Sequence, residues 1–176
     1  MEDSMDFCVA DITSRFPQID PEVEGIVDRV DAIQKHSTRI FEDTLAEHGL
    51  NRGEYKLLLR LKTRTEDRQL SAGDLSKMLM LSSGAMTNRL DRMESAGLVR
   101  RVPDPRDRRG VLVQLTDKGE QLLDRAVTAS ATEDAKLFEA LNKRERTQLN
   151  QLLRKVLLSL EARPERERPK TSAVAD

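Results

Sequence analysis

The chain has few of the residues that build disulfides, metal sites or redox sites. Its 176 residues include one cysteine, Cys8, two histidines, one tyrosine and no tryptophan. A single cysteine excludes an intrachain disulfide and is typical of a protein kept in a reducing compartment. The two histidines, His36 and His48, have no cluster of further metal ligands beside them in the sequence. We therefore expect no metal and no cofactor.

Long hydrophobic runs and an excess of one charge are also missing. No stretch of about eighteen apolar residues exists, so we expect no membrane span. The acidic start, Met1-Glu2-Asp3-Ser4, lacks the basic and then apolar order of a secretory signal, which predicts a cytoplasmic protein. A formal net charge of -1 excludes a uniformly basic coat for nucleic acid, but it allows a local basic patch. Without a glycine-rich phosphate loop or a nucleophile elbow, we expect no enzyme.

Helical periodicity dominates what is present. Apolar residues from Val23 onward predict a long amphipathic helix that ends near Gly49. Two capping-box patterns, at 51–54 and 71–74, predict the starts of a second helix and of a short third helix with Leu75 and Met78 facing inward. The polar stretch 63–69 between them is interpreted as a loop. Ser82 is a suitable N-cap for a helix that runs to about Ala96, with Met86, Leu90 and Met93 on its core face.

The period changes after Gly97, where a left-handed helix end is expected. The runs 98–102 and 111–115 are rich in β-branched residues and predict two strands. Between them, residues 103–110 form a charged, turn-rich hairpin tip. Thr116 then caps a long helix to about Ala140, and Asn142 begins a final helix with a clear apolar stripe. An acidic extension over 1–20, with a short helix before Phe16-Pro17, and a disordered tail over 163–176 complete the chain.

Two tightly joined helices followed by a hairpin are typical of a winged helix-turn-helix, a mostly α (α+β) fold with long N- and C-terminal helices. The helix from Ser82 begins with small side chains, which allow a close approach to DNA. We assign Ala85 and Asn88 to base edges, one turn apart, because asparagine can pair with adenine through two hydrogen bonds. The candidate contacts to the DNA backbone are Ser82, Ser83, Thr87 and Arg89 on this helix and Ser71 at the N-terminus of the short helix before it.

The hairpin tip strengthens the DNA-binding interpretation. Arg106, Arg108 and Arg109 repel one another on a short turn that has no core to stabilise. The negative potential of a narrow minor groove would attract such a tip, and we assign Arg106 and Arg108 to it. Asp104 is expected to orient Arg106 by a charge-assisted hydrogen bond.

The stretch from Leu81 to Gly119 resembles the MarR family of bacterial regulators. The signature is D-x-R…R-G-V followed by L-T-x-x-G, and it runs here from Asp104 through Gly110 and Thr116 to Gly119. The resemblance implies a domain over 21–162 with a DNA-binding lobe at about 51–118. It also implies a homodimer on a palindromic operator, with a wing arginine in the minor groove.

A dimer is also expected from the helices themselves, because the middle of the chain is too short to cover both apolar stripes. The predicted interface residues are Val27, Leu149, Leu152, Leu153, Val156 and Leu157. In this family small effectors bind beside the first long helix, which makes His36, Arg39 and Arg52 weak candidates for an effector cleft. Cys8 lies upstream of that helix and is interpreted as an inert thiol.

The expected function is sequence-specific transcriptional regulation. A repressor would bind double-stranded DNA as a homodimer and leave it when a small effector changes the spacing of the two DNA-binding lobes. An activator is an alternative, because the sign depends on where the operator lies. Two other classes stay open: an architectural DNA binder without sequence preference, and a winged-helix module that binds proteins only.

Overall fold

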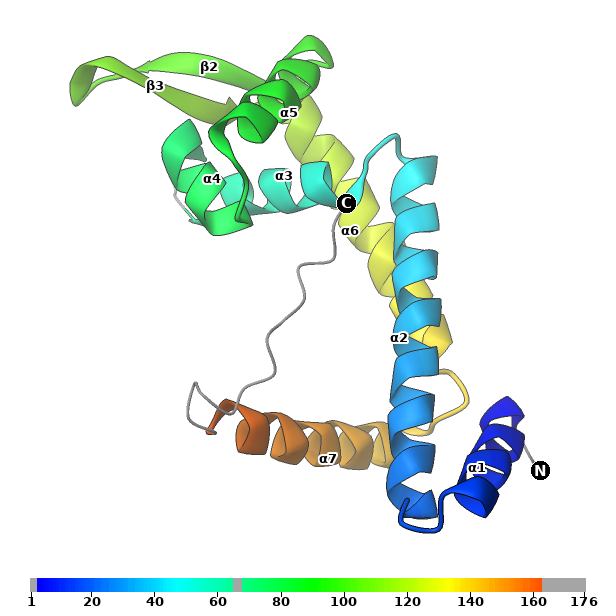
Figure 1. The fold of residues 1–176 in the computed structure, drawn as a ribbon. Helices are drawn as coiled ribbons and strands as arrows, with labels where there is room; N and C mark the ends of the chain where they lie inside the picture. The colour runs from blue at the N-terminus through cyan, green and yellow to red at the C-terminus, as the bar shows by residue number, and fades with distance from the viewer. Residues whose placement is uncertain (1–2, 65–67, 163–176) are drawn as a thin grey trace. The chain divides into compact units, whose positions relative to one another are not determined.

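The computed structural model describes residues 3–64 and 68–162, and the predicted tail over 163–176 lies outside these residues. It is mostly helical with a small antiparallel sheet, which confirms the expected fold class (Figure 1). None of the described helices is long and apolar enough to span a membrane. In chain order the elements are α1 (Ser4–Arg15), α2 (Pro21–Glu47), α3 (Arg52–Arg64), β1 (Gln69–Ser71), α4 (Ala72–Leu79), α5 (Ser83–Ser95), β2 (Val99–Asp104), β3 (Asp107–Leu115), α6 (Asp117–Leu137) and α7 (Lys143–Glu161).

The helices begin and end where the local signals predict. Asn51 and Glu54 exchange capping bonds of 3.0 and 3.1 Å, and Asn142 forms the same box at α7. The Ser71 hydroxyl accepts a bond from the backbone N–H of Asp74 at 3.0 Å. Gly97 has φ of 72°, the left-handed conformation expected at that helix end. These signals act within a few residues, so the sequence is sufficient to locate them.

Three local expectations were wrong. The predicted loop over 63–69 is wrong at both ends, because α3 continues to Arg64 and Gln69 begins strand β1, which pairs with β3 so that Leu70 faces Val113. Residues 103–110 are mostly strand, because Pro103 pairs with Val111 and β3 begins at Asp107. Met78 is 40% exposed, and only Leu75 of α4 is fully buried. The two strand errors have different causes. Strand β1 depends on a partner more than forty residues away, whereas the β2–β3 pairing continues farther toward the hairpin tip than local propensity predicts.

The core lies where α3, α4, α5 and α6 meet the base of the β2–β3 hairpin. Fully buried leucines and methionines come from every one of these elements, and α2 contributes Leu45 near its C-terminal end. Burial of such side chains stabilises a domain by about 1.5–3 kcal/mol each. The hairpin extends away from this core beyond α4 and α5 (Figure 1). The core residues are Leu45, Leu50, Leu57, Leu58, Leu61, Leu75, Met86, Leu90, Met93, Leu98, Val99, Val113, Leu115, Leu123 and Ala126.

Helix α1 is attached to α2 by an ion-pair cluster. The Arg29 guanidinium donates to both carboxylate oxygens of Asp3, at 2.9 and 3.2 Å, and to Asp6 at 2.5 Å. Asp3 is also the N-cap of α1. Gly25 is buried beneath this contact, with Val9 of α1 above it. The Arg29 hydrogen bonds hold the pKa of the Asp3 carboxyl below its ordinary value of 3.8.

We expect Arg29→Gln to release α1 from α2 at neutral pH, because the substitution removes the cation that both carboxylates share. Backbone amide hydrogen exchange over α1 should accelerate, whereas exchange over α3–α5 should not change. Since the folded-state pKa of Asp3 is lowered, its contribution is complete above about pH 4 and is lost as the pH falls through the lowered value. Arg15→Gln is the control, because Arg15 pairs with Asp11 inside α1. Equal exchange in the two variants would contradict the attachment.

The chain divides into two compact units, residues 1–134 and 135–176. The second unit contains α7, whose polar N-terminal turn is capped by Asn142. Its apolar side chains are largely exposed, with Leu153 at 48% and Val156 at 59%. These residues match the stripe that the sequence predicts for the last helix.

Candidate nucleic-acid interface

Helix α5 separates a core face from an exposed face, as expected. Met86, Leu90 and Met93 are almost fully buried and fix its orientation against the core. The Ser82 hydroxyl accepts from the backbone N–H of Ala85 at 3.3 Å and so caps the helix. Arg89 is half-buried. The remaining predicted contact residues of this helix are all exposed: Ser82, Ser83, Ala85, Thr87 and Asn88.

Arg89 turns toward α3 instead of lying free on the exposed face. Its guanidinium lies over Gly53, where a Cβ would be only 2.6 Å from Nη2. Its Nε is buried and has no hydrogen-bond partner within the described part of the chain. Next to it, Arg92 faces Glu54 at 3.9 Å. A contact from Arg89 to the DNA backbone therefore stays a prediction that requires this side chain to leave α3.

The wing presents Arg106 at its tip. Strands β2 and β3 pair in register to Pro103 and Val111, and a bulge follows between Pro103 and Asp104. Arg106 is exposed, and its backbone N–H donates to the Asp104 carboxylate at 2.9 Å. Asp104 thus holds the turn through the main chain, rather than by the predicted contact with the guanidinium. The side chain of Arg108 lies outside the described part of the structure.

Glycine is required at the wing tip. A Cβ on Gly110 would lie 2.9 Å from Asp104 Cβ and 3.2 Å from the backbone oxygen of Asp107. The absence of a side chain therefore lets the two strands close tightly beneath Arg106. This close approach explains the glycine of the R-G-V motif in physical terms.

Ser71 is already engaged in its own helix cap. Besides accepting from the Asp74 amide, its hydroxyl donates to the Asp74 carboxylate at 2.7 Å. A negative charge therefore stands at the N-terminus of α4, where the sequence predicted a phosphate contact. That contact stays a prediction and would require Asp74 to turn aside.

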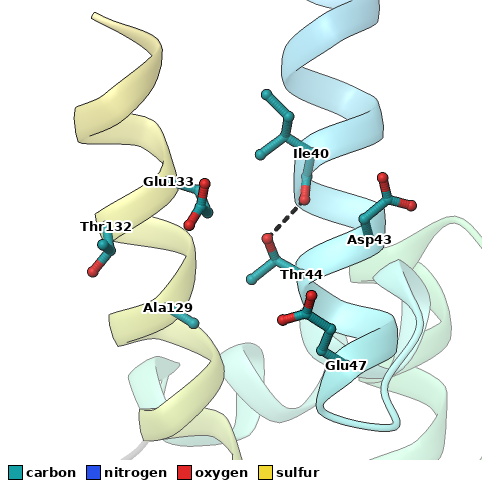
Figure 2. A pocket seen from close by; sticks show the side chains of 7 residues that line it. All are labelled: Ile40, Asp43, Thr44, Glu47, Ala129, Thr132 and Glu133. Carbon is teal, nitrogen blue, oxygen red and sulfur yellow. Dashed lines mark hydrogen bonds between the residues drawn. The ribbon is translucent and has the colours of Figure 1, made fainter. Parts of the chain in front are cut away.

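The three candidate effector residues do not line the cavity beside α2. His36, Arg39 and Arg52 are all exposed, and none lines the cavity of about 450 Å³ between α2 and α6. Figure 2 shows that side chains from both helices face this cavity, where Thr44 donates to the backbone oxygen of Ile40 at 2.7 Å. Its lining is acidic rather than basic: Ile40, Asp43, Thr44, Glu47, Ala129, Thr132 and Glu133.

One contact beside this interface was not predicted from the sequence. Arg101 of β2 reaches back to α5, with Nη2 2.6 Å from Asp91 and its backbone N–H 2.8 Å from Glu94 Oε1. A second guanidinium nitrogen, Nη1, also bonds to Glu94. The sequence does show two acidic residues near the end of α5 and an arginine on the next strand. Only the fold places these three side chains together.

Comparisons with known proteins decide the family. The MarR family model matches residues 50–111, which include α5 and most of the wing. The HTH-type transcriptional regulator YkoM of Bacillus subtilis is 36% identical over 124 residues, which cover 70% of this chain and 76% of YkoM. This chain belongs to the MarR family.

Other MarR-family relatives extend the match. The transcriptional regulator PecS of Dickeya dadantii is 29% identical over 152 residues, which are 84% of this chain and 92% of PecS. The structure of wild-type MarR from Escherichia coli superimposes with a TM-score of 0.61 at 27% identity, covering 74% of this chain and 95% of that one. A mutant of the same protein complexed with operator DNA matches with a TM-score of 0.57 at 28% identity, over 77% and 96% of the two chains. The chain is thus a transcriptional regulator of the MarR family.

Proposed function

We propose that this chain is a repressor that binds a pseudo-palindromic operator as a homodimer. The observation that carries the proposal is that two exposed elements, α5 and the wing, project from one core. Small and polar side chains occupy the outer face of α5, and Arg106 stands at the tip of a wing whose turn is held by Asp104. In this arrangement Asn88 and Ala85 would face bases in the major groove, and Arg106 would enter the adjacent minor groove.

The homodimer is supported by apolar side chains that are not covered within the chain. Five residues of α2 and five of α7, each set at helical spacing, are between 42% and 59% exposed. Contiguous apolar surface of this kind marks an interaction site. Helix α1 packs at Gly25 and Arg29 and leaves the α2 stripe open. A second copy would cover both stripes: Val23, Ile26, Val27, Val30, Ile33, Leu152, Leu153, Val156, Leu157 and Leu160.

Release by a small effector is also part of the proposal. In one form of the dimer the spacing of the two DNA-binding lobes would not fit the operator. An effector that binds this form more tightly would shift the population toward it and away from the operator-binding form. If it enters the α2–α6 cavity, we expect a neutral or cationic molecule. The carboxylates of Asp43, Glu47 and Glu133 would repel an anion there.

Fluorescence anisotropy on the DNA upstream of the chain's own gene tests the proposal. A specific regulator should bind this duplex roughly a thousandfold more tightly than an unrelated one. An architectural DNA binder would show equal affinity for both duplexes, with log K falling by about 0.9 per phosphate contact per log unit of salt. A protein-binding module would bind neither duplex. Transcription from the same promoter, with and without the protein, then separates repressor from activator.

We expect Arg106→Ala to weaken operator binding by about 1–3 kcal/mol, because the wing would lose its groove contact. The control is Arg125→Ala, which removes the same charge from an exposed position on α6. Anisotropy titrations of both variants at one salt concentration give the comparison, and circular dichroism checks the fold. Equal affinities of the two variants would contradict the assignment of Arg106 to the groove.

A further inference from the structure

The contact between Arg101 and α5 joins the two elements that the proposed function uses separately. The Arg101 guanidinium lies between Asp91 and Glu94, which are three residues apart on α5 and so share one face. The backbone N–H of Arg101 adds a third attachment, to Glu94. We call Arg101, Asp91 and Glu94 the Arg101 bridge. Hydrogen bonds from the Arg101 backbone and side chain lower the pKa of Glu94, so its carboxylate is charged at neutral pH.

The position of the Arg101 bridge along β2 determines what it can control. Leu98 and Val99 are buried and fix the base of the wing in the core. Outward from Arg101, Val102 and Pro103 pair with β3. Arg100 bonds to Gln114 across the hairpin at 2.7 Å and makes no bond to α5 among the interactions of the described residues. The bridge is therefore where an otherwise projecting hairpin is held to the side of α5.

A small change of wing direction at this point has a large effect at the tip. Strand β2 continues for three residues beyond Arg101, which corresponds to roughly 10 Å of extended strand, and Arg106 lies in the turn that follows. A tilt of about 10° at the bridge would move the end of β2, and the turn that carries Arg106, by roughly 2 Å, given that strand length. Such a displacement is comparable with the length of a hydrogen bond. If the wing were released from α5, Arg106 could not contact the minor groove while α5 stays in place in the major groove.

We propose that Arg101 is a positioning residue that sets the angle between the wing and α5, so that Arg106 and the outer face of α5 meet one operator together. The inference rests on the proposed function. It assigns specificity to a residue that contacts α5 rather than a base. Asp91 and Glu94 serve the same purpose, although they add negative charge beside the DNA-binding surface.

The negative charge of Asp91 and Glu94 lets one experiment distinguish a positioning role from a purely electrostatic one. The double variant Asp91→Asn with Glu94→Gln removes two negative charges near the DNA. If only electrostatics mattered, affinity for every duplex would rise. If the bridge positions the wing, affinity for the operator should fall by about tenfold, the loss expected from one misplaced specific contact, while affinity for an unrelated duplex should stay equal or rise. Increased affinity for both duplexes would overturn the proposal.

Arg101→Gln and Arg100→Gln provide the matched pair. Both remove one positive charge from neighbouring positions of β2, but only the first breaks the bridge. We expect Arg101→Gln to reduce the ratio of operator affinity to affinity for unrelated DNA by about tenfold, and Arg100→Gln to leave that ratio unchanged. Equal ratios in the two variants would also overturn the proposal.

A measurement without DNA separates this inference from the proposed function. Nitroxide labels introduced by Ser95→Cys and Val111→Cys in a Cys8→Ser background report the distance between α5 and the wing, with labelled chain diluted in unlabelled chain. The distance distribution should broaden in Arg101→Gln and not in Arg100→Gln. Unchanged distributions would refute the bridge as the element that sets the angle. A wild-type protein that prefers no duplex would refute the proposed function, whatever these distances show.

Discussion

Gly119→Ala should lower the free energy of unfolding by about 2 kcal/mol or more, although alanine is the better helix former. A Cβ at this position would lie 2.9 Å from the carbonyl carbon of Leu98 and closer still to its oxygen. That carbonyl cannot move aside freely, because the Thr116 hydroxyl and the Thr116 backbone N–H both donate to it, at 3.0 and 3.2 Å. The first turn of α6 would have to separate from the base of the wing.

Gly84→Ala is the control for Gly119→Ala. Gly84 lies in the first turn of α5, and a Cβ there would have nothing within 4 Å. The same substitution should therefore leave stability unchanged or raise it by up to about 1 kcal/mol. Urea unfolding followed by circular dichroism, at equal protein concentrations, measures both variants. Equal stability of the two variants would show that Leu98 and α6 relax more easily than the contacts suggest.

Leu153→Asp should raise the dissociation constant of the proposed homodimer by at least about a hundredfold. Truncation of a buried leucine costs about 2–5 kcal/mol, and a charge placed in an apolar interface costs more. Each dimer would carry the change twice. In the single chain Leu153 is 48% exposed, so the fold of the chain should tolerate the substitution.

Gln151→Asp on the same helix is the matched control, because residue 151 lies on the side of α7 opposite the apolar stripe. Sedimentation velocity over a range of concentrations should show a dimer for the wild type and for Gln151→Asp, and a monomer for Leu153→Asp. Operator affinity should fall together with the dimer, since both half-sites contribute to binding. A wild type that sediments as a monomer, or a Leu153→Asp variant that remains a dimer, would contradict the proposed interface.

The helices and their ends could be predicted because their signals are local. The capping box of Asn51 and Glu54 closes within four residues, and the left-handed Gly97 needs no distant partner. The core face of α5 follows from the 3.6-residue period alone, and Met86, Leu90 and Met93 are buried as expected. The charged hairpin and the motif around it were sufficient to indicate the family.

Other features depended on contacts between segments far apart in the chain. Strand β1 exists because β3 pairs with it more than forty residues later, and Arg89 turns inward because Gly53 of α3 leaves room for its guanidinium. The acidic lining of the α2–α6 cavity combines two helices that no local pattern connects.

By itself, the sequence determined the order of the helices, the core face of α5 and the family, because periodicity and caps are properties of neighbouring residues. Only the tertiary structure decided how Arg101 joins the wing to α5 and why position 119 must be glycine. Both depend on which backbone and side-chain atoms meet across the core. Packing at that level is a property of the whole domain and cannot be deduced from any one segment.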